Sequence, residues 1–325
     1  MREIVSMHIG QCGLQMGYDF WTGVCEEHSI NPDLTSNDME IAASNQVFFE
    51  EVDGSRFVPR SVMIDLEPGV ADSIQASPYG RVFNPENIVT GTNGAGNCWA
   101  TGFYSEGAEI IDSVLERTRK LAEGCDSMEG FILTHSMGGG TGSGLGARVI
   151  KELRAEFHDR MIHTYSVFPS KSVSDVIVEP YNSTLSMSYL IEESDMNVVI
   201  DNEALFGIHE RQLKERHPSF SMLNSLIKRN LLETTASLRF GGLQNAGLRK
   251  LATNLCPFPR LHFLTTSIAP LFNHIDARYE RLEVPDLVRE MLNNNNSYCN
   301  TDFKTGRFLT GAAMFRGQCS QGDID

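Results

Sequence analysis

The chain has 325 residues, of which 41% are hydrophobic and 21% charged, and its formal net charge is −15. This length and apolar content allow two domains with buried cores and exclude an intrinsically disordered chain. The acidic balance argues against a nucleic-acid partner, because a polyanion is repelled by a protein of the same charge.

The seven cysteines are widely spaced and form no C-x-x-C pair, which indicates reduced thiols in a cytoplasmic protein. The nine histidines form no H-E-x-x-H motif, which argues against zinc. The chain contains no run of 18 apolar residues, and its first residues lack the apolar region of a signal peptide. We therefore expect no membrane partner.

Short apolar runs alternate with helical patterns over the first two-thirds of the chain. The strand-like runs are Ile4–Ile9, Val62–Ile64, Ile88–Val89, Phe131–Leu133, Tyr165–Phe168 and Val198–Ile200. Between them, single helical faces are formed by Leu14, Tyr18, Trp21 and Cys25, and by Leu145, Val149, Leu153 and Phe157. This alternation predicts an α/β fold with a doubly wound, mostly parallel sheet, whose ligand lies beyond the carboxyl ends of the strands.

The later part of the chain predicts a second, smaller α/β domain. Strand-like runs lie at Leu261–Thr265 and Phe308–Phe315, and a helix candidate at Val284–Leu292 has Pro285 near its start. The expected units are a nucleotide-binding domain, a connecting helical region and a partial second domain, with the respective bounds 1–203, 204–240 and 241–325.

The segment F-I-L-T-H-S-M-G-G-G-T-G-S-G runs from a strand through a turn into a helix. Five glycines between Gly138 and Gly144 leave little Cβ bulk, so backbone N–H groups can approach phosphate oxygens. The helix that follows presents its positive end to the same anion, and Ser136 and Thr141 add hydroxyl donors. A flexible linker would not lie between a buried strand and an amphipathic helix, so we interpret the segment as a phosphate-binding turn.

The motifs in and around this turn limit which class of phosphate-binding fold the chain can have. The chain has no G-x-x-x-x-G-K-[ST] motif and no Gly-Lys pair, so it is not a P-loop protein. The spacing Gly142-x-Gly144-x-x-Ala147 fits a loose dinucleotide fingerprint, but the next strand ends at Phe168–Pro169 without the expected acid. A dinucleotide oxidoreductase therefore remains only a weakly supported alternative.

A second glycine-rich turn, G-T-N-G-A-G-N, ends at Asn97, which is a suitable cap for a helix beginning near Cys98. Together with the first turn it could enclose a triphosphate. Asp65 and Glu67 follow a strand directly and could form an ordinary solvated turn. Because neither phosphate turn contains a lysine, we favour Mg²⁺, held by one of these carboxylates directly or through water, as the charge neutraliser.

Three further pairs of polar residues fall where a nucleotide would need them. They are Gln11 and Gln15 for phosphate and base, Asp175 and Glu179 for ribose hydroxyls, and Asn202 and Asn224 for a base edge. None of these pairs is specific by itself.

The segments together resemble the tubulin family, whose distant bacterial relative is FtsZ. Beside G-G-G-T-G-S-G, the similar motifs, in the order of that family, are M-R-E-I, G-Q-C-G, D-L-E-P-G, G-A-G-N, V-E-P-Y-N, D-N-E-A-L, P-F-P-R-L-H-F and F-R-G. They span nearly the whole chain. Cys12, P-F-P-R-L-H-F and the short loop near Asp33–Asn37 are more similar to β-tubulin than to α-tubulin.

The resemblance implies GTP or GDP with Mg²⁺ as cofactors. The implied nucleotide contacts are Gln11, Cys12, Gln15, Glu67, Ala95, Gly96, Asn97, Ser136, Gly138, Gly139, Gly140, Thr141, Gly142, Asp175, Glu179, Asn202, Phe220 and Asn224. Of these, Phe220 would stack on guanine, and Glu67 would serve Mg²⁺, with Asp65 contributing through water.

The resemblance also implies head-to-tail assembly into cytoskeletal protofilaments, in which acids on one subunit's loop complete GTP hydrolysis on the next. In this chain the loop contains Asn245, Gly247 and Lys250, and the last two stand where the catalytic form has acids. We therefore expect no catalytic residue in this chain. Its own GTP would be hydrolysed only when an acid-bearing, α-tubulin-like partner caps it.

Family members continue well past the position of Asp325, so the outer C-terminal helices are expected to be absent here. Two functions remain open. One is a cytoplasmic β-tubulin-like subunit that forms heterodimers and microtubule-like filaments. The alternative is a truncated homologue that binds GTP or tubulin as a regulator and does not itself polymerise.

Overall fold

The computed structural model describes residues 2–36, 46–52, 56–170, 173–215, 218–240, 247–271, 283–317 and 321–324. Within these ranges, seven strands form one sheet in the order β5-β4-β1-β6-β7-β8-β9, and every neighbouring pair is parallel. The strands are β1 (Glu3–Ile9), β4 (Ser61–Asp65), β5 (Ile88–Thr90), β6 (Met128–Ser136), β7 (Met161–Phe168), β8 (Met196–Asp201) and β9 (Phe263–Thr265). A separate antiparallel ribbon pairs β2 (Phe49–Val52) with β3 (Arg56–Pro59). The predicted α/β class is confirmed.

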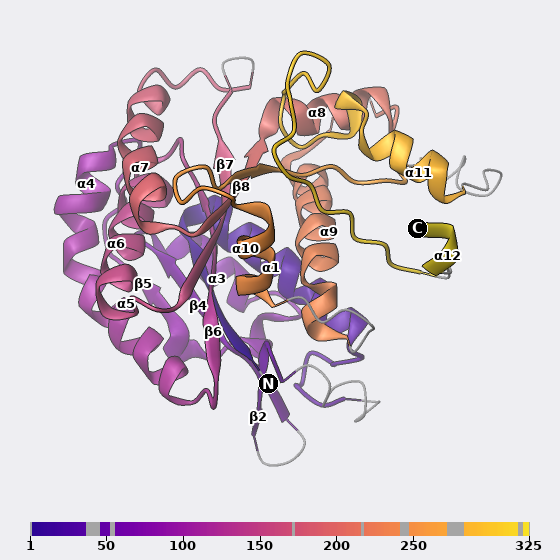
Figure 1. Ribbon diagram of the computed structural model, residues 1–325. Coiled ribbons are helices and arrows are strands. Elements are labelled where there is room, and N and C mark those ends of the chain that lie inside the picture. Colours follow the sequence, from indigo (N-terminus) through magenta and orange to yellow (C-terminus); the bar gives the residue numbers. More distant parts are fainter. Residues whose placement is uncertain are drawn as a thin grey trace.

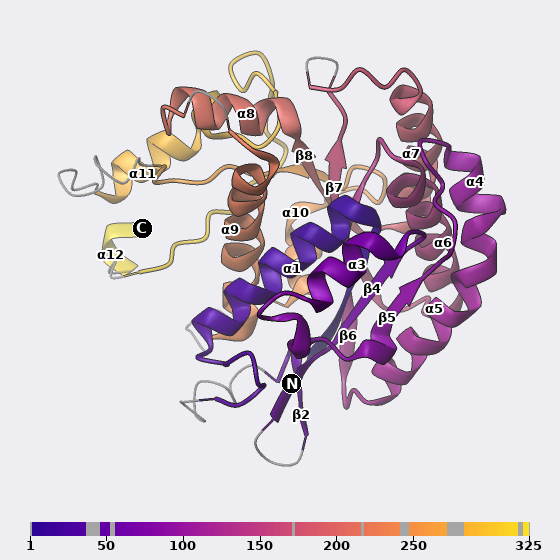
Figure 2. The same ribbon diagram turned by 180° about the vertical axis from the view of Figure 1, so that it is seen from behind.

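Helices cover both faces of the sheet, as Figures 1 and 2 show from opposite sides. One face carries α1 (Gly10–Glu27), α3 (Pro68–Gln75) and α9 (Phe220–Arg239). The other carries α4 (Trp99–Tyr104), α5 (Glu106–Glu123), α6 (Gly146–Glu156) and α7 (Glu179–Glu193). The remaining helices are α8 (Asn202–Arg211), α10 (Leu248–Leu255), α11 (Val284–Met291) and α12 (Gln321–Ile324). None of the helices in the described ranges is long and apolar enough to span a bilayer.

The two largest apolar cores of the described residues are divided by the alternation of side chains along the central strand β1. Ile4 belongs to the core under α1 and α9, whereas Val5, Met7 and Ile9 belong to the core under α5 and α6. All four side chains are fully buried, because a parallel strand with helices on both faces has no solvated side. The central strands thus read as nearly continuous apolar runs, and this is why they could be recognised.

Helix α1 lies very close to the sheet because two of its glycines face β1 and β6. A Cβ on Gly13 would overlap the Thr134 carbonyl oxygen, and a Cβ on Gly17 would overlap the His8 ring. The Trp21 indole N–H donates to His8 Nε2 (3.1 Å), so His8 carries its proton on Nδ1 and donates to Thr134 Oγ1 (2.7 Å). Burial lowers the pKa of His8 to about 3, so this buried network is neutral.

The second half of the chain agrees with the sequence-based expectations only in part. The helix predicted at Val284–Leu292 is α11, which begins with Pro285 in its first turn, and the run Leu261–Thr265 contains β9. The strand predicted at Phe308–Phe315 is wrong, because this segment has no ladder partner in the part of the chain that the structure describes. An apolar run without a neighbouring strand cannot form the hydrogen bonds that define a sheet.

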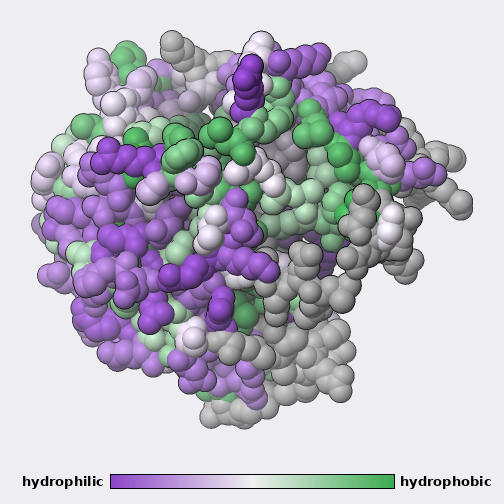
Figure 3. Space-filling model, in the orientation of Figure 1, coloured by the Kyte–Doolittle hydropathy of each residue, from purple (hydrophilic) through white to green (hydrophobic). Residues whose placement is uncertain are grey.

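The segment after α11 crosses one face of the molecule on the side of α9 (Figure 1). Phe308, Leu309 and Met314 are exposed in it, and Figure 3 shows apolar side chains reaching the surface on this face. Its far end is fixed by Arg316, whose guanidinium pairs with Glu27 of α1 at 2.7 Å. Because β9 pairs with β8, the main sheet also takes a strand from the region predicted as the second domain.

The close approach of α1 predicts an asymmetry between two helical glycines. Gly17→Ala should lower the free energy of unfolding by about 1–3 kcal/mol, because the added methyl group overlaps the His8 ring in a packed core. Gly69→Ala in α3 is the control, since a Cβ there meets no atom within 4 Å and alanine favours a helix. Urea unfolding of both variants measures the difference. Equal stability of the two variants would contradict the packing described here.

Candidate functional site

The glycine-rich turn joins the end of β6 to α6 at the carboxyl edge of the sheet. Thr141–Leu145 form a wide π-helical turn that continues into α6 without a break. The N–H groups of the first turn of a helix have no partner within that helix and carry its partial positive charge. The turn therefore offers the donors and the polarity that a phosphate group needs.

The glycines of this turn serve two different purposes. A Cβ on Gly140 would come within 2.8 Å of the Ala95 carbonyl oxygen, and a Cβ on Gly142 within 2.7 Å of the Ser136 carbonyl oxygen. These positions require glycine because the backbone packs there. A Cβ on Gly139 would meet no atom within 4 Å. Gly139 thus faces open space, where a ligand can approach the backbone.

Two turns that are distant in the sequence contact this one. The Gly140 N–H donates to the Gly96 carbonyl oxygen at 2.9 Å, which joins the two glycine-rich turns predicted to act together. Gly10, at the start of α1, has a φ of +73°, and a Cβ there would lie 3.0 Å from the Gly142 nitrogen. The crevice predicted at the carboxyl ends of β1, β5 and β6 is therefore formed by backbone in direct contact.

Asn182 on α7 links the two glycine-rich turns, a role that the sequence analysis missed. Its side chain is buried, and Nδ2 donates to the carbonyl oxygens of Gly138 (2.7 Å) and Asn97 (2.8 Å). Its Oδ1 accepts the Trp99 N–H at 3.1 Å and so caps α4. The prediction that Asn97 caps this helix is wrong, because the cap position is Cys98 and the capping acceptor comes from Asn182. The sequence signal that could have identified Asn182 is its position at the end of the V-E-P-Y-N motif.

His135 supports the glycine-rich turn from below and was also missed. Its Nδ1 lies 2.9 Å from the Gly142 carbonyl oxygen and must carry the proton to donate to it. Its Nε2 then accepts the Ser166 hydroxyl at 2.8 Å, and Ser166 accepts an N–H from Asn197 at 2.8 Å. Burial lowers the pKa of His135 to about 4, which keeps the ring neutral.

The two predicted metal carboxylates lie in different environments. Asp65 is buried at the end of β4, where its Oδ1 accepts the N–H groups of Leu66 (2.8 Å) and Glu67 (3.4 Å). Burial raises the pKa of Asp65 to about 6. Glu67 is exposed, and its carboxylate lies against Gly94 in the second glycine-rich turn. Glu67 is therefore the better-placed of the two to reach a cation at a phosphate.

No cluster of three or more His, Cys, Asp or Glu side chains occurs within the described ranges. At the predicted site, the described residues offer the carboxylates of Asp65 and Glu67. This donor set suits Mg²⁺, which keeps several waters and commonly shares phosphate oxygens as ligands.

The other predicted contacts surround the same edge. Gln11 is exposed on the first turn of α1, with Cys12 and Gln15 half-buried behind it. Glu179 starts α7 and accepts the Ser174 hydroxyl at 2.8 Å, and a Cβ on Gly138 would lie 3.2 Å from its carboxylate. Asp175 is exposed in the preceding loop. Their assignment to a nucleotide stays a prediction.

The residues predicted to bind a base lie at the starts of α8 and α9. Asn202 is the first residue of α8, and Phe220 and Asn224 lie one turn apart at the start of α9. Phe220 is 60% exposed and packs edge-to-face on Phe206, with ring centroids 6.0 Å apart. An aromatic ring exposed to this extent is suited to stacking on a base.

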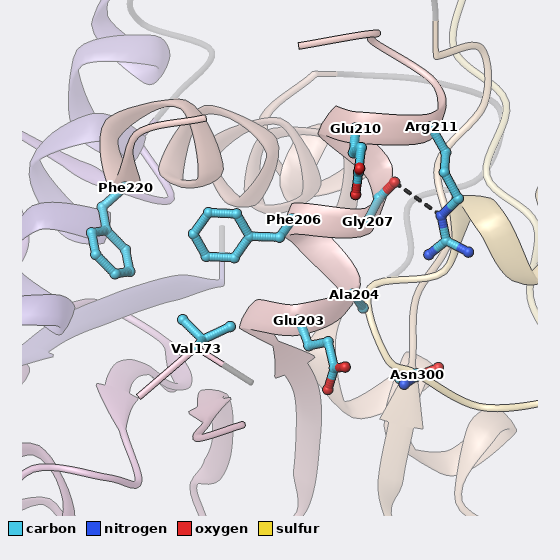
Figure 4. Close-up of a pocket in the computed structure, with 9 residues that line it drawn as sticks. All are labelled: Val173, Glu203, Ala204, Phe206, Gly207, Glu210, Arg211, Phe220 and Asn300. Carbon is cyan, nitrogen blue, oxygen red and sulfur yellow. Dashed lines mark hydrogen bonds between the residues drawn. The ribbon is translucent and has the colours of Figure 1, made fainter. Parts of the chain in front are cut away.

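A hollow of about 720 Å³ adjoins this region (Figure 4). Of the predicted nucleotide contacts it includes only Phe220, whose ring lies beside that of Phe206, while Glu203 and Arg211 lie toward its other end. The complete lining is Val173, Glu203, Ala204, Phe206, Gly207, Glu210, Arg211, Phe220 and Asn300. The hollow thus includes none of the predicted phosphate contacts.

The described end of the loop predicted to face a partner, from Gly247 onward, lies at the opposite, amino edge of the sheet. Asn245 lies outside the described residues, whereas Gly247 is the N-cap of α10 and Lys250 is exposed in its first turn. Arg249, between them, donates from Nη2 to the Asp159 carbonyl oxygen, just before β7 begins. The two predicted contact regions of the chain are therefore separated by the length of the strands.

Comparison with protein families gives two matches. Residues 3–210 match the GTPase domain of the Tubulin/FtsZ family, and residues 259–325 match the Tubulin C-terminal domain. The first match covers more than half of the chain and contains all the predicted phosphate, metal and ribose contacts. Phe220, Asn224 and the loop around Gly247 lie between the two matched regions.

The buried position of His135 predicts a pH effect that one substitution isolates. Its pKa is lowered from 6.5 to about 4, so between these values the native state holds fewer protons than the unfolded chain, and stability falls as the pH falls. Between pH 7 and pH 5 this group removes about 2 kcal/mol. His135→Gln keeps a donor and an acceptor. Between pH 7 and pH 5, its free energy of unfolding, measured with urea, should therefore fall by about 2 kcal/mol less than that of the wild type. Parallel pH profiles would contradict a neutral, buried His135.

Proposed function

Because the chain belongs to the Tubulin/FtsZ family, we propose that it is a β-tubulin-like cytoskeletal subunit that binds GTP with Mg²⁺ and assembles head to tail with an α-tubulin-like partner. The observation that carries this proposal is the contact between the glycine-rich turns, through Gly140 N–H and the Gly96 carbonyl oxygen, at the carboxyl edge of the sheet. The family supplies the nucleotide, and the contacts of this chain indicate how it is held.

The phosphates would be held mainly by backbone. Gly139 and Gly96 have open space where a side chain would otherwise lie, and both belong to turns fixed from behind by Asn182. The hydroxyls of Ser136 and Thr141 lie at the two ends of the first turn and add donors. Glu67 would hold Mg²⁺, which neutralises phosphate charge when bound. This matters because the protein is acidic overall and supplies no lysine to the turns.

The nucleoside would lie toward α8 and α9. Asp175 and Glu179 would accept from ribose hydroxyls, Phe220 would stack on the base, and the amides of Asn202 and Asn224 would pair with its edge. Guanine presents a donor and an acceptor side by side, and an amide matches both. This arrangement supports GTP over a nicotinamide dinucleotide, for which the acid after β7 is missing.

The polarity of the sheet supports head-to-tail assembly. Strand β6 has nine residues and spans about 26 Å, with the phosphate turn at its end and α10 packed near its start. One chain therefore has a nucleotide site at one edge and Lys250 at the other. Such unlike, complementary faces produce filaments when the rotation between copies does not close.

The same geometry explains the proposed division of catalytic labour. Lys250 is a cation, so near a neighbour's phosphates it would stabilise their charge but could not take a proton from the attacking water. The described part of the loop offers no carboxylate of its own, since Gly247 has no side chain. Hydrolysis of this chain's GTP would then depend on an acid supplied by the partner, which positions water for in-line attack.

The split among the glycines predicts separable effects on binding and folding. Gly139→Ala should weaken GTP binding about ten-fold or more while leaving unfolding unchanged, because its methyl group would enter the space proposed for phosphate. Gly140→Ala is the matched variant and should lower stability, since its methyl group would lie 2.8 Å from two carbonyl oxygens. Fluorescent-nucleotide titration and urea unfolding test the pair. Undiminished GTP binding by Gly139→Ala would place the phosphates elsewhere.

The missing acid predicts the kinetics of turnover. GTP hydrolysis by the chain alone should stay slow and should not rise steeply with protein concentration, whereas an α-tubulin-like partner should accelerate it in pelletable polymer. Lys250→Glu should make the chain alone faster by on the order of 10²-fold, because the new carboxylate can activate water on the next copy, and Lys250→Gln should not. Steep concentration dependence in the wild type would refute the proposal. GTP binding without pelleting, even with the partner, would instead support the non-polymerising regulator.

A further inference from the structure

Helix α10 begins at a residue that cannot cap it. The first N–H groups of a helix need acceptors, and the N-cap side chain usually supplies one. Here the N-cap is Gly247, which has no side chain, yet Leu248 and Leu251 of the helix are buried in the protein. Because the start of α10 is partly buried, its N–H groups gain from an acceptor supplied by another part of the chain.

Glu129, the second residue of β6, supplies that acceptor. Its side chain is only 3% exposed, and its Oε1 accepts the Arg249 N–H, in the first turn of α10, at 3.2 Å. A Cβ placed on Gly247 would overlap the same carboxylate. Glu129 therefore occupies the space that a capping side chain at position 247 would take, and it makes the hydrogen bond that such a side chain would make.

The charges around Glu129 favour this arrangement. A carboxylate is stabilised at the positive end of a helix, and Arg2 Nη1 lies 3.6 Å from the same Oε1. Arg249 is held at both ends, because its backbone N–H reaches Glu129 and its guanidinium donates to the Asp159 carbonyl oxygen at 2.6 Å. The start of α10 is thus attached to the amino ends of both β6 and β7.

We propose that Glu129 is a positioning residue, whose carboxylate replaces the cap that Gly247 lacks and fixes where α10 begins. Its functional consequence rests on the proposed assembly: Lys250, one residue after Arg249, can face a neighbour's phosphates in a defined orientation only if this first turn is ordered. The strand that carries Glu129 ends at Ser136, so one rigid element connects the start of α10 with the phosphate turn.

The test moves the carboxylate from position 129 to position 247. Glu129→Ala should speed amide hydrogen exchange in residues 248–255 about five-fold, because a helix cap is lost. Gly247→Asp alone should also speed it, because its side chain overlaps Glu129. The double variant should restore slow exchange, since the aspartate can then cap α10 in the space that Glu129 has left. Glu129→Gln, which keeps an acceptor but not the charge, should fall between the wild type and Glu129→Ala.

Helix α5 (Glu106–Glu123), whose buried side chains belong to a different apolar core from Leu248 of α10, is the internal control for general loss of folding, and its amide hydrogen exchange should be unchanged in all variants. Unchanged exchange of α10 in Glu129→Ala, or a double variant no better than Glu129→Ala, would overturn the proposal. The hydrogen-exchange measurements on α10 and α5 need only the isolated chain, so they remain decisive if the proposed assembly fails.

A second arm tests the functional consequence in the presence of the α-tubulin-like partner. Glu129→Ala should reduce pelletable polymer at a fixed protein concentration, and the double variant should recover it. If polymer formation is lost in Glu129→Gln while α10 exchange stays at the wild-type rate, Glu129 acts directly at the interface and the positioning role is wrong. If the wild type itself does not pellet, the proposed function fails, but the exchange result still stands.

Discussion

The glycine-rich turn between β6 and α6 depends on a buried hydrogen-bond chain that runs from β8 through β7 to β6. Asn197 donates to Ser166, Ser166 donates to His135, and His135 donates to the Gly142 carbonyl oxygen, each over 2.8–2.9 Å. A glycine-rich turn has little side-chain packing of its own, so its shape must be imposed from outside. This series of hydrogen bonds requires a neutral His135 imidazole, which has one donor and one acceptor. Burial in the sheet provides that protonation state.

Above the turn, Asn182 completes the arrangement by joining the carbonyl oxygens of Gly138 and Asn97. The backbone N–H groups around Gly139 are thus held between two polar supports, His135 from the sheet and Asn182 from α7. Pre-organised donors lose little entropy when an anion binds, which suits two glycine-rich turns that contain no lysine and belong to an acidic protein. Neither support would touch the nucleotide itself.

Glycines leave room for different groups at the two edges of the sheet. At the carboxyl edge, glycines allow backbone to contact backbone, and open space is left for a ligand. At the amino edge, Gly247 leaves room for a carboxylate from β6 and not for a ligand. Glycine thus has different roles at the two ends of β6, and only the neighbouring atoms show which role a given glycine has.

The sequence by itself determined the class of fold, the central strands and the position of the glycine-rich turn between a strand and a helix. It could do so because these are local signals: apolar runs of strand length, and glycines between a strand and a helix. It failed at Phe308–Phe315, an apolar run that has no strand partner in the described part of the chain, and at Asn97, because the Trp99 N–H is accepted by Asn182, 83 residues away. Only the tertiary structure decided that Asn182, His135 and Glu129 matter, because hydrogen bonds between residues distant in the sequence leave no periodic pattern along it.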